Sequence, residues 1–143
     1  MSHSIIDIEG VGDVYAKKLQ DAGIRTTEAL LEACASPKGR KEMAEKTGIS
    51  DALILKWTNH ADLFRITGVA GQFAELLEAA GVDTVKEFRH RKAENLHAKM
   101  EEVNAAKKLT RRIPSVSQLE AMIEEAGKLE PNDILNLRFS FFY

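Results

Sequence analysis

A pattern of glycine and apolar residues occurs twice in this chain, 58 residues apart. The first copy covers residues 8–24 and the second covers residues 66–82. The matched pairs include Gly10 with Gly68, Val11 with Val69, Tyr15 with Phe73, Ala16 with Ala74, Leu19 with Leu77, and Gly23 with Gly81. This repeat constrains the fold more than any single residue does, because the two copies are expected to form similar units that share a core.

Each copy predicts a tight turn followed by a short amphipathic helix. Two glycines around Val11 allow the chain to turn sharply where a side chain would clash. The helix that follows starts with unpaired backbone N–H groups. Ala16 is small enough for another helix to approach closely, and Leu19 continues the buried face at helical spacing. Gly23 then provides a left-handed stop.

The turn of apolar residue, glycine, apolar residue and glycine, with a small residue four positions later, resembles the helix-hairpin-helix motif. The second copy departs from that motif, since Ala70 replaces the second glycine. The stretch from about His60 to Leu129 also resembles an uncharacterised bacterial family, a domain of unknown function that contains helix-hairpin-helix units. The residues that carry this resemblance are LLEAAGVDTV at 76–85, ENLH at 94–97 and RRIPS at 111–115. The resemblance implies a fold and no established activity.

The predicted fold is all-α, with two fused helix-hairpin-helix units of short helices that share one core. The first unit covers residues 1–65 and the second covers residues 51–130, so the helix at 51–65 belongs to both. Trp57 lies in the middle of this shared helix and is predicted to be the core residue that joins the units. An aromatic tail at 131–143 alternates apolar and polar residues, which is typical of an extended segment with one apolar face. We expect the tail to dock on its own chain or on another copy.

Polar residues predict where several helices begin. A serine or threonine hydroxyl before a helix can accept a hydrogen bond from a free backbone N–H group. The predicted caps of this kind are Ser50, Thr84, Ser115 and either Thr26 or Thr27. Ser36 and Pro37 mark another start, since proline is tolerated at a first helical position. The expected helices cover residues 13–22, 27–35, 38–46, 51–65, 71–80, 85–91, 93–103 and 115–129.

The charge of the chain is unevenly distributed. A net charge of −2 argues against a surface that binds nucleic acid everywhere. Residues 86–112 nevertheless carry a charge of +5, from nine Lys and Arg and four Glu. The extra residues of the second unit, near 105–112, contain four basic residues and no acid, and we expect these four to be exposed. This segment is either a working face or only a solvated surface.

The resemblance to helix-hairpin-helix proteins suggests a nucleic-acid interface. DNA-binding members hold a backbone phosphate with the N–H groups at the start of the post-turn helix. The candidate residues here are Gly10, Gly12, Asp13, Val14, Lys17, Lys18, Lys107, Lys108, Arg111 and Arg112. Two residues weigh against this role, since Val14 replaces a common Lys or Arg and Asp13 adds negative charge.

The favoured interpretation is therefore a non-enzymatic binding module that binds DNA weakly and without sequence preference. The alternative is a protein-interaction or assembly module with no role in nucleic-acid binding, whose partner would be another protein or a second copy bound through the tail. Salt separates the two, because DNA binding weakens steeply as counterions are added.

No catalytic residue, cofactor or metal site is predicted. Cys34 is the only cysteine, which excludes a disulfide framework or a cysteine zinc site, and it is expected to be buried. His90 and His97 lie across a predicted helix break without a third ligand at a recognisable spacing. The chain also lacks a phosphate-binding loop and a dinucleotide fingerprint. No segment approaches the roughly 18 apolar residues of a membrane span, so we expect a cytoplasmic protein.

Overall fold

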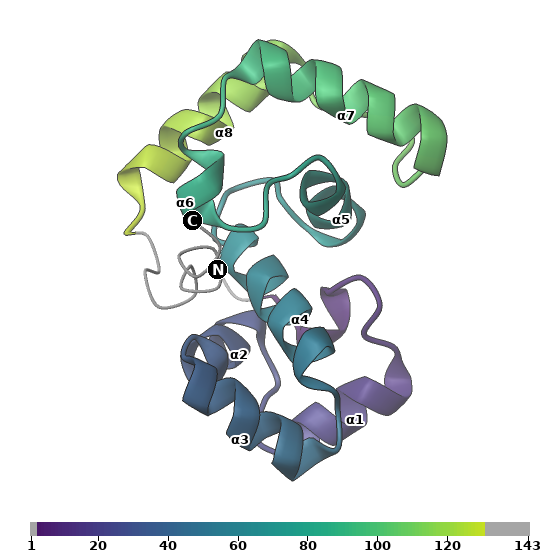
Figure 1. Cartoon of the computed structure of the whole chain (residues 1–143), viewed down its shortest axis with the longest axis vertical. Helices are drawn as coiled ribbons and strands as arrows, with labels where there is room; N and C mark the ends of the chain where they lie inside the picture. The colour runs from purple at the N-terminus through teal and green to yellow at the C-terminus, as the bar shows by residue number, and fades with distance from the viewer. Residues whose placement is uncertain (1–2, 131–143) are drawn as a thin grey trace.

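A computed structural model describes residues 3–130 of the chain (Figure 1). Over these residues the fold is all-helical, with one 3-10 helix, eight α-helices and no β-strand. The elements are η1 (Ile5–Asp7), α1 (Asp13–Asp21), α2 (Thr27–Cys34), α3 (Pro37–Thr47), α4 (Asp51–Leu63), α5 (Gly71–Ala79), α6 (Val85–Phe88), α7 (Ala93–Lys107) and α8 (Val116–Lys128). The predicted tail lies outside the described residues, and the predicted unit boundaries stay predictions.

Helix α4 runs through the middle of the molecule and connects two groups of helices (Figure 1). In the first group, α2 and α3 pack against α4, and η1 packs against α1. In the second group, α5 packs against α7, α6 against α8, and α7 against α8. The contact between α4 and α5 links the groups. No helix in the described part of the chain has both the length and the apolar character needed to cross a membrane.

One core of buried apolar side chains extends through both groups of helices. Trp57 of α4 is 1% exposed, and its ring contacts the ring of Tyr15 edge to face, with centroids 5.1 Å apart. Such aromatic pairs add to the free energy gained by burial alone. The prediction that Trp57 is a core residue is therefore confirmed.

The helix starts agree with the predicted caps. The hydroxyl oxygens of five residues accept a hydrogen bond from a backbone N–H in the first turn of the helix that follows, and these residues are Thr26, Ser36, Ser50, Thr84 and Ser115. Of the two threonines proposed for α2, Thr26 is the cap.

Two helix ends differ from the prediction. Helix α6 ends at Phe88, earlier than expected, whereas α7 continues to Lys107. Lys108 terminates α7 in the left-handed conformation, with φ of 52°, at a position that glycine usually occupies. The end of α7 is difficult to predict from the sequence, because the residue that terminates the helix is not a glycine.

The two predicted turns have matching backbone conformations. Gly10 has φ of 92° and Gly68 has φ of 89°, which is the left-handed region that favours glycine. After each glycine, the N–H of a buried valine donates to a carbonyl oxygen three residues earlier at 3.1 Å, from Val11 to Ile8 and from Val69 to Ile66. The repeated sequence pattern therefore produces a repeated local geometry.

Gly12 contradicts one part of the predicted turn. Its backbone is extended, with φ of −85° and ψ of −175°, and a Cβ built there would meet no atom within 4 Å. A side chain would therefore not clash inside the protein, and the expectation of a clash at the second glycine is wrong. Ala70 occupies the matched position with φ of −155°, which shows that the turn tolerates a side chain there.

Candidate functional site

The start of α1 carries the first group of candidate residues. Gly12 is the N-cap residue of α1 and makes no side-chain cap hydrogen bond, and the same is true of Ala70 at the start of α5. The first N–H groups of an α-helix have no partner within the helix. Both post-turn helices therefore begin without the hydroxyl cap that most of the other helices have.

The surroundings of these two helix starts differ. A Cβ built at Gly71, the first residue of α5, would lie 3.5 Å from the carbonyl oxygen of Asp7 and 4.0 Å from Oε2 of Glu9. The carbonyl oxygen of Asp7 and the carboxylate of Glu9 thus lie beside the start of α5, where the helix dipole favours negative charge. At the start of α1, by contrast, Gly12, Asp13 and Val14 are exposed. The start of α1 is therefore open to an external group.

The charged residues of α1 lie on its exposed face. Lys17 and Lys18 are both exposed, while Ala16 and Leu19 are buried as predicted. Lys17 forms an exposed ion pair with Asp21, with Nζ and Oδ2 3.6 Å apart. Exposed pairs of this kind contribute little free energy, so Lys17 can exchange Asp21 for another anion.

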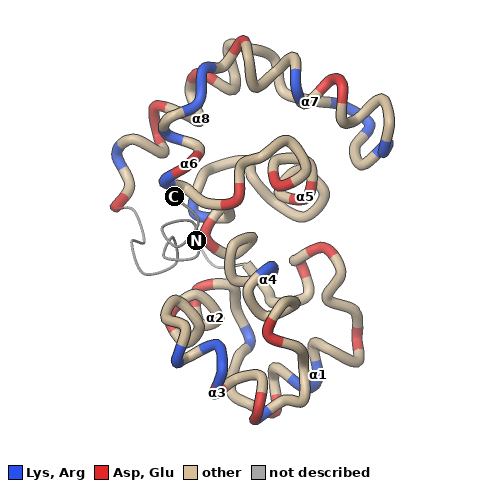
Figure 2. The backbone as a smooth tube through the Cα atoms, in the orientation of Figure 1, with Lys and Arg blue, Asp and Glu red and all other residues tan. Residues whose placement is uncertain are grey.

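The four basic residues near 107–112 lie at the opposite end of the molecule from α1 (Figure 2). Lys107 ends α7, Lys108 follows it, and Arg111 and Arg112 lie in the loop before α8. All four are exposed, as predicted. The candidate nucleic-acid residues therefore form two separate sets rather than one surface.

The loop that carries these arginines is held by side-chain hydrogen bonds. The amide Nδ2 of Asn104 donates to the carbonyl oxygen of Thr110, and the N–H of Thr110 donates to Oδ1 of Asn104, both at 3.0 Å. The extra residues of the second half thus extend α7 beyond its predicted end at residue 103 and add a loop held by these hydrogen bonds.

A cluster of four ionisable side chains joins α4 to α5, and the sequence analysis did not identify it. Nε2 of His60 lies 3.3 Å from Oε2 of Glu78 and 3.9 Å from Oε2 of Glu75. Nζ of Lys56 lies 3.1 Å from Oε1 of Glu75 and 3.7 Å from Oε1 of Glu78. His60 is fully buried, and no described residue meets hydrogen-bond geometry with either ring nitrogen, despite the short distance to Glu78.

Opposite charges in this cluster shift two pKa values. Burial raises the pKa of Glu78, but the neighbouring side chains of His60 and Lys56 outweigh burial and bring the pKa below its usual value. Burial lowers the pKa of Lys56, but Glu75 and Glu78 outweigh it and raise the pKa. The cluster therefore favours the carboxylate form of Glu78 and the ammonium form of Lys56.

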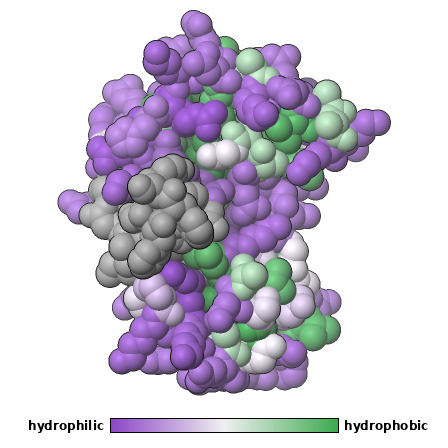
Figure 3. Space-filling view, viewed as in Figure 1, coloured by the Kyte–Doolittle hydropathy of each residue, from purple (hydrophilic) through white to green (hydrophobic). Residues whose placement is uncertain are grey.

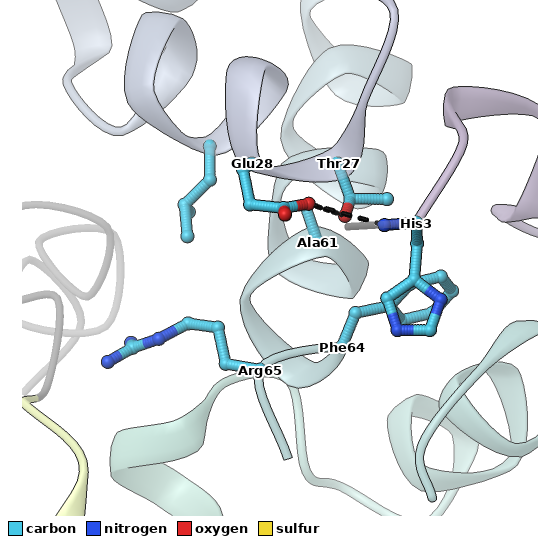
Figure 4. Close-up of a pocket in the computed structure, with 7 residues that line it drawn as sticks. His3, Thr27, Glu28, Ala61, Phe64 and Arg65 are labelled. Atoms are coloured by element: carbon cyan, nitrogen blue, oxygen red, sulfur yellow. Dashed lines mark hydrogen bonds between the residues drawn. The ribbon is translucent and has the colours of Figure 1, made fainter. Parts of the chain in front are cut away.

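A cavity of about 250 Å³ lies between the start of the chain, α2 and α4 (Figure 4). The ring of His3 contacts the ring of Phe64, with centroids 5.0 Å apart. The hydroxyl of Thr27 donates to Glu28 at 2.9 Å instead of facing an imidazole. Arg65, at the edge of the cavity, donates to Asp62 at 2.8 Å. These contacts connect residue His3 and the start of α2 with the end of α4.

Cys34 is fully buried, as predicted. Burial raises the pKa of its thiol to about 11, although Arg40 and Thr58 act in the opposite direction. The thiolate is the reactive form of cysteine, so this thiol is a poor nucleophile at neutral pH.

Comparison with known proteins adds one finding. No curated protein and no solved structure matches the chain. The resemblance to an uncharacterised family is confirmed, and it extends further toward the start of the chain than the segment from His60 to Leu129. Because the family described as domain of unknown function (DUF4332) matches residues 9–129, which is most of the chain, the protein belongs to that family.

Proposed function

We propose that the protein is a non-enzymatic binding module, built from two fused helix-hairpin-helix units, that binds the phosphate backbone of DNA at the start of α1. One observation carries this proposal. The start of α1 has no side-chain cap, is exposed, and bears a glycine that the fold itself does not need. A glycine without an internal reason suggests close approach of an external group.

The chemistry at this helix start suits an anion. The backbone N–H groups of Gly12, Asp13 and Val14 point outward from the helix end, and the helix dipole favours negative charge there. Lys17 and Lys18 add positive charge one turn further along α1. The negative charge of Asp13 repels an anion at this helix start, so we expect weak binding. The contact reads no base edge, so we expect no sequence preference.

The basic residues near 107–112 supply a second contact in this proposal. Because they lie far from α1, they do not complete the phosphate site at α1 (Figure 2). Because all four are exposed, their positive charges are available to attract a nucleic acid. Loss of these charges should weaken binding without changing the contact at Gly12.

The non-enzymatic part of the proposal has its own support. Cys34 is fully buried, and burial raises the pKa of its thiol. A catalytic nucleophile needs an adjacent base or a lowered pKa.

A protein-interaction module is the second candidate. Two exposed large apolar side chains favour it, Val14 at 70% and Ile6 at 44% exposure. Both belong to the first group of helices, where Figure 3 shows hydrophobic surface over the side on which η1 and α1 lie. An association that buries apolar surface persists at moderate salt concentration, whereas one made only through phosphate contacts weakens.

The test compares serine caps at the two matched helix starts. In Gly12→Ser the oxygen of the new hydroxyl can accept a hydrogen bond from a free backbone N–H group at the start of α1. The side chain would also keep a phosphate group from approaching the backbone closely, so DNA binding should fall. Ala70→Ser is the matched control, because the start of α5 already lies against Asp7 and Glu9. Binding of a short duplex is measured by fluorescence anisotropy across a salt series.

Three further outcomes decide between the candidates. Replacing Lys17 and Lys18 together with glutamine should reduce the slope of log affinity against log salt by about one per lost phosphate contact. Absence of DNA binding at low salt, or equal loss in Gly12→Ser and Ala70→Ser, would contradict the DNA proposal. A salt-resistant assembly that Val14→Ser disrupts would then favour the protein-interaction module.

A further inference from the structure

We propose that His60, Glu75 and Glu78 form a binding site for one divalent transition-metal ion of the zinc class, between α4 and α5. The site is independent of the start of α1 and of the proposed DNA contact. One ligand atom from each of the three residues lies within 4.8 Å of the others. Imidazole nitrogen and carboxylate oxygen are both common zinc ligands.

The buried histidine distinguishes this cluster from a group of acidic side chains alone. His60 is completely buried, and among residues 3–130 neither of its ring nitrogens has a partner with hydrogen-bond geometry. Buried polar atoms are nearly always satisfied, so an unpaired imidazole needs an explanation. Nε2 faces the Oε2 atoms of Glu78 and Glu75, at 3.3 Å and 3.9 Å. An ion held between these three atoms would satisfy Nε2.

Lys56 is compatible with this arrangement, because it uses the other edge of each carboxylate. Its Nζ lies near the Oε1 atoms, at 3.1 Å from Glu75 and 3.7 Å from Glu78, and leaves the Oε2 atoms toward His60. An outer partner of this kind orients a ligating carboxylate. The ammonium group also repels a cation, so it lowers affinity while it fixes geometry.

The geometry requires a small closure on binding. Zinc lies about 2.0–2.2 Å from nitrogen and oxygen ligands, which places tetrahedral ligand atoms roughly 3.5 Å apart. Glu75 and Glu78 have side chains that are 23% and 26% exposed, so they can move inward and also give the ion a path from solvent. Three protein ligands leave a fourth position for water.

The choice of metal follows from the ligands. Imidazole favours zinc, copper, nickel and cobalt over magnesium and calcium, which prefer oxygen ligands. Nδ1 of His60 has no acceptor within the described part of the chain, whereas metal-bound histidines usually donate from that nitrogen. We therefore expect Zn²⁺ to bind more weakly than in a closed structural zinc site.

The two carboxylates of the cluster occur only in the second copy of the repeat. At the repeat offset of 58, Glu75 corresponds to Lys17 and Glu78 to Gln20. At these matched positions on α1 the chain has no carboxylate. The site therefore does not follow from the repeated helical plan, and its residues are a separate feature of the contact between α4 and α5.

The test uses the full chain in a buffer that does not chelate metals. Zn²⁺ titration by calorimetry should show one equivalent bound, and the melting temperature should rise with Zn²⁺ but not with the same concentration of Mg²⁺. Co²⁺ in place of Zn²⁺ should give visible absorption bands of a bound ion. Glu75→Gln and Glu78→Gln should each weaken Zn²⁺ binding by at least about tenfold.

Two further variants make the result specific. Glu101→Gln is the matched control, since Glu101 pairs with His97 on α7 at 2.9 Å and offers an ordinary surface histidine and carboxylate. It should leave Zn²⁺ binding unchanged. Lys56→Gln should tighten Zn²⁺ binding, because it removes the competing charge. Absence of Zn²⁺ binding in the wild type, or equal binding in wild type and Glu78→Gln, would overturn the proposal.

Discussion

The two turn-and-helix segments share their backbone conformation at the turn glycine and at the helix end, but their surroundings differ. In both, the residue after the final glycine closes the helix, since Ile24 donates to Leu19 and Val82 donates to Leu77, each at 2.8 Å. Helix α1 nevertheless starts in solvent, while α5 starts beside Asp7 and Glu9. The comparison teaches that a local pattern can determine backbone geometry without determining what a helix end is able to bind.

The helices that close each half show the same contrast. Ile54, Trp57, Ala61 and Phe64 of the α4 region are all buried. At an offset of 65 residues, the corresponding positions in and after α8 are Leu119, Met122, Ala126 and Leu129. Leu119 and Ala126 are buried, but Met122 and Leu129 are only partly buried. The difference arises because α4 lies between the two groups of helices and α8 lies at one end (Figure 1).

The largest expected effect tests this contrast between α4 and α8. Trp57→Ala should reduce the free energy of unfolding by about 3–5 kcal/mol, because it leaves a large cavity in the core. Met122→Ala should cost clearly less, since Met122 is already partly exposed. Urea unfolding of both variants measures the difference. Equal losses would mean that α8 is as enclosed as α4.

A smaller effect is expected at the two turns. Gly10→Val and Gly68→Val should each reduce stability by about 1–3 kcal/mol, because valine is strained at positive φ. Gly68→Val should be the more damaging, since a Cβ there would lie 3.2 Å from Cε of Met122. Thermal unfolding of the pair measures both. If neither variant loses stability, the shared turn geometry is incorrect.

The ion cluster gives a pH-dependent prediction that has no counterpart on α1. The pKa of Glu78 is lowered in the folded protein from its ordinary value of 4.5. Its carboxylate therefore stabilises the fold at pH values above 4.5. This contribution is lost as the pH falls through the folded-state pKa. Glu78→Gln should therefore cost about 1 kcal/mol or less at neutral pH and almost nothing in acid.

A matched surface pair serves as the control for that experiment. Glu124 pairs with Lys128 on α8 at 3.5 Å, and both side chains are largely exposed. Glu124→Gln should change stability by less than Glu78→Gln at neutral pH. A difference between wild type and Glu78→Gln that persists unchanged in acid would show that the ion pairs do not account for it.

The smallest expected effect concerns Gly12. Its extended backbone and open surroundings accept a side chain, and serine can cap α1, so Gly12→Ser should change stability by only a few tenths of a kcal/mol. Chemical denaturation of this variant measures the change. A large loss would restore the original view that the fold itself needs the second glycine.

Local chemistry explains why much of the fold was predictable from sequence. Ser50, Thr84 and Ser115 cap helices where a hydroxyl precedes an apolar helical pattern, and Gly23 and Gly81 stop helices with φ above 90°. The end of α7 was less predictable, because Lys108 is left-handed without being a glycine. These signals act over a few residues, so they define helices and not their neighbours.

The sequence by itself determined the all-helical class, the repeated turn and the helix caps, since all of these depend on interactions between residues close together in the chain. Only the tertiary structure decided that Glu9 lies beside the start of α5 and that His60 faces Glu75 and Glu78. His60 and the two glutamates lie on different helices, and no fixed spacing relates them. Their meeting depends on how α4 packs against α5, and a side chain gains or loses a partner only when that packing is complete.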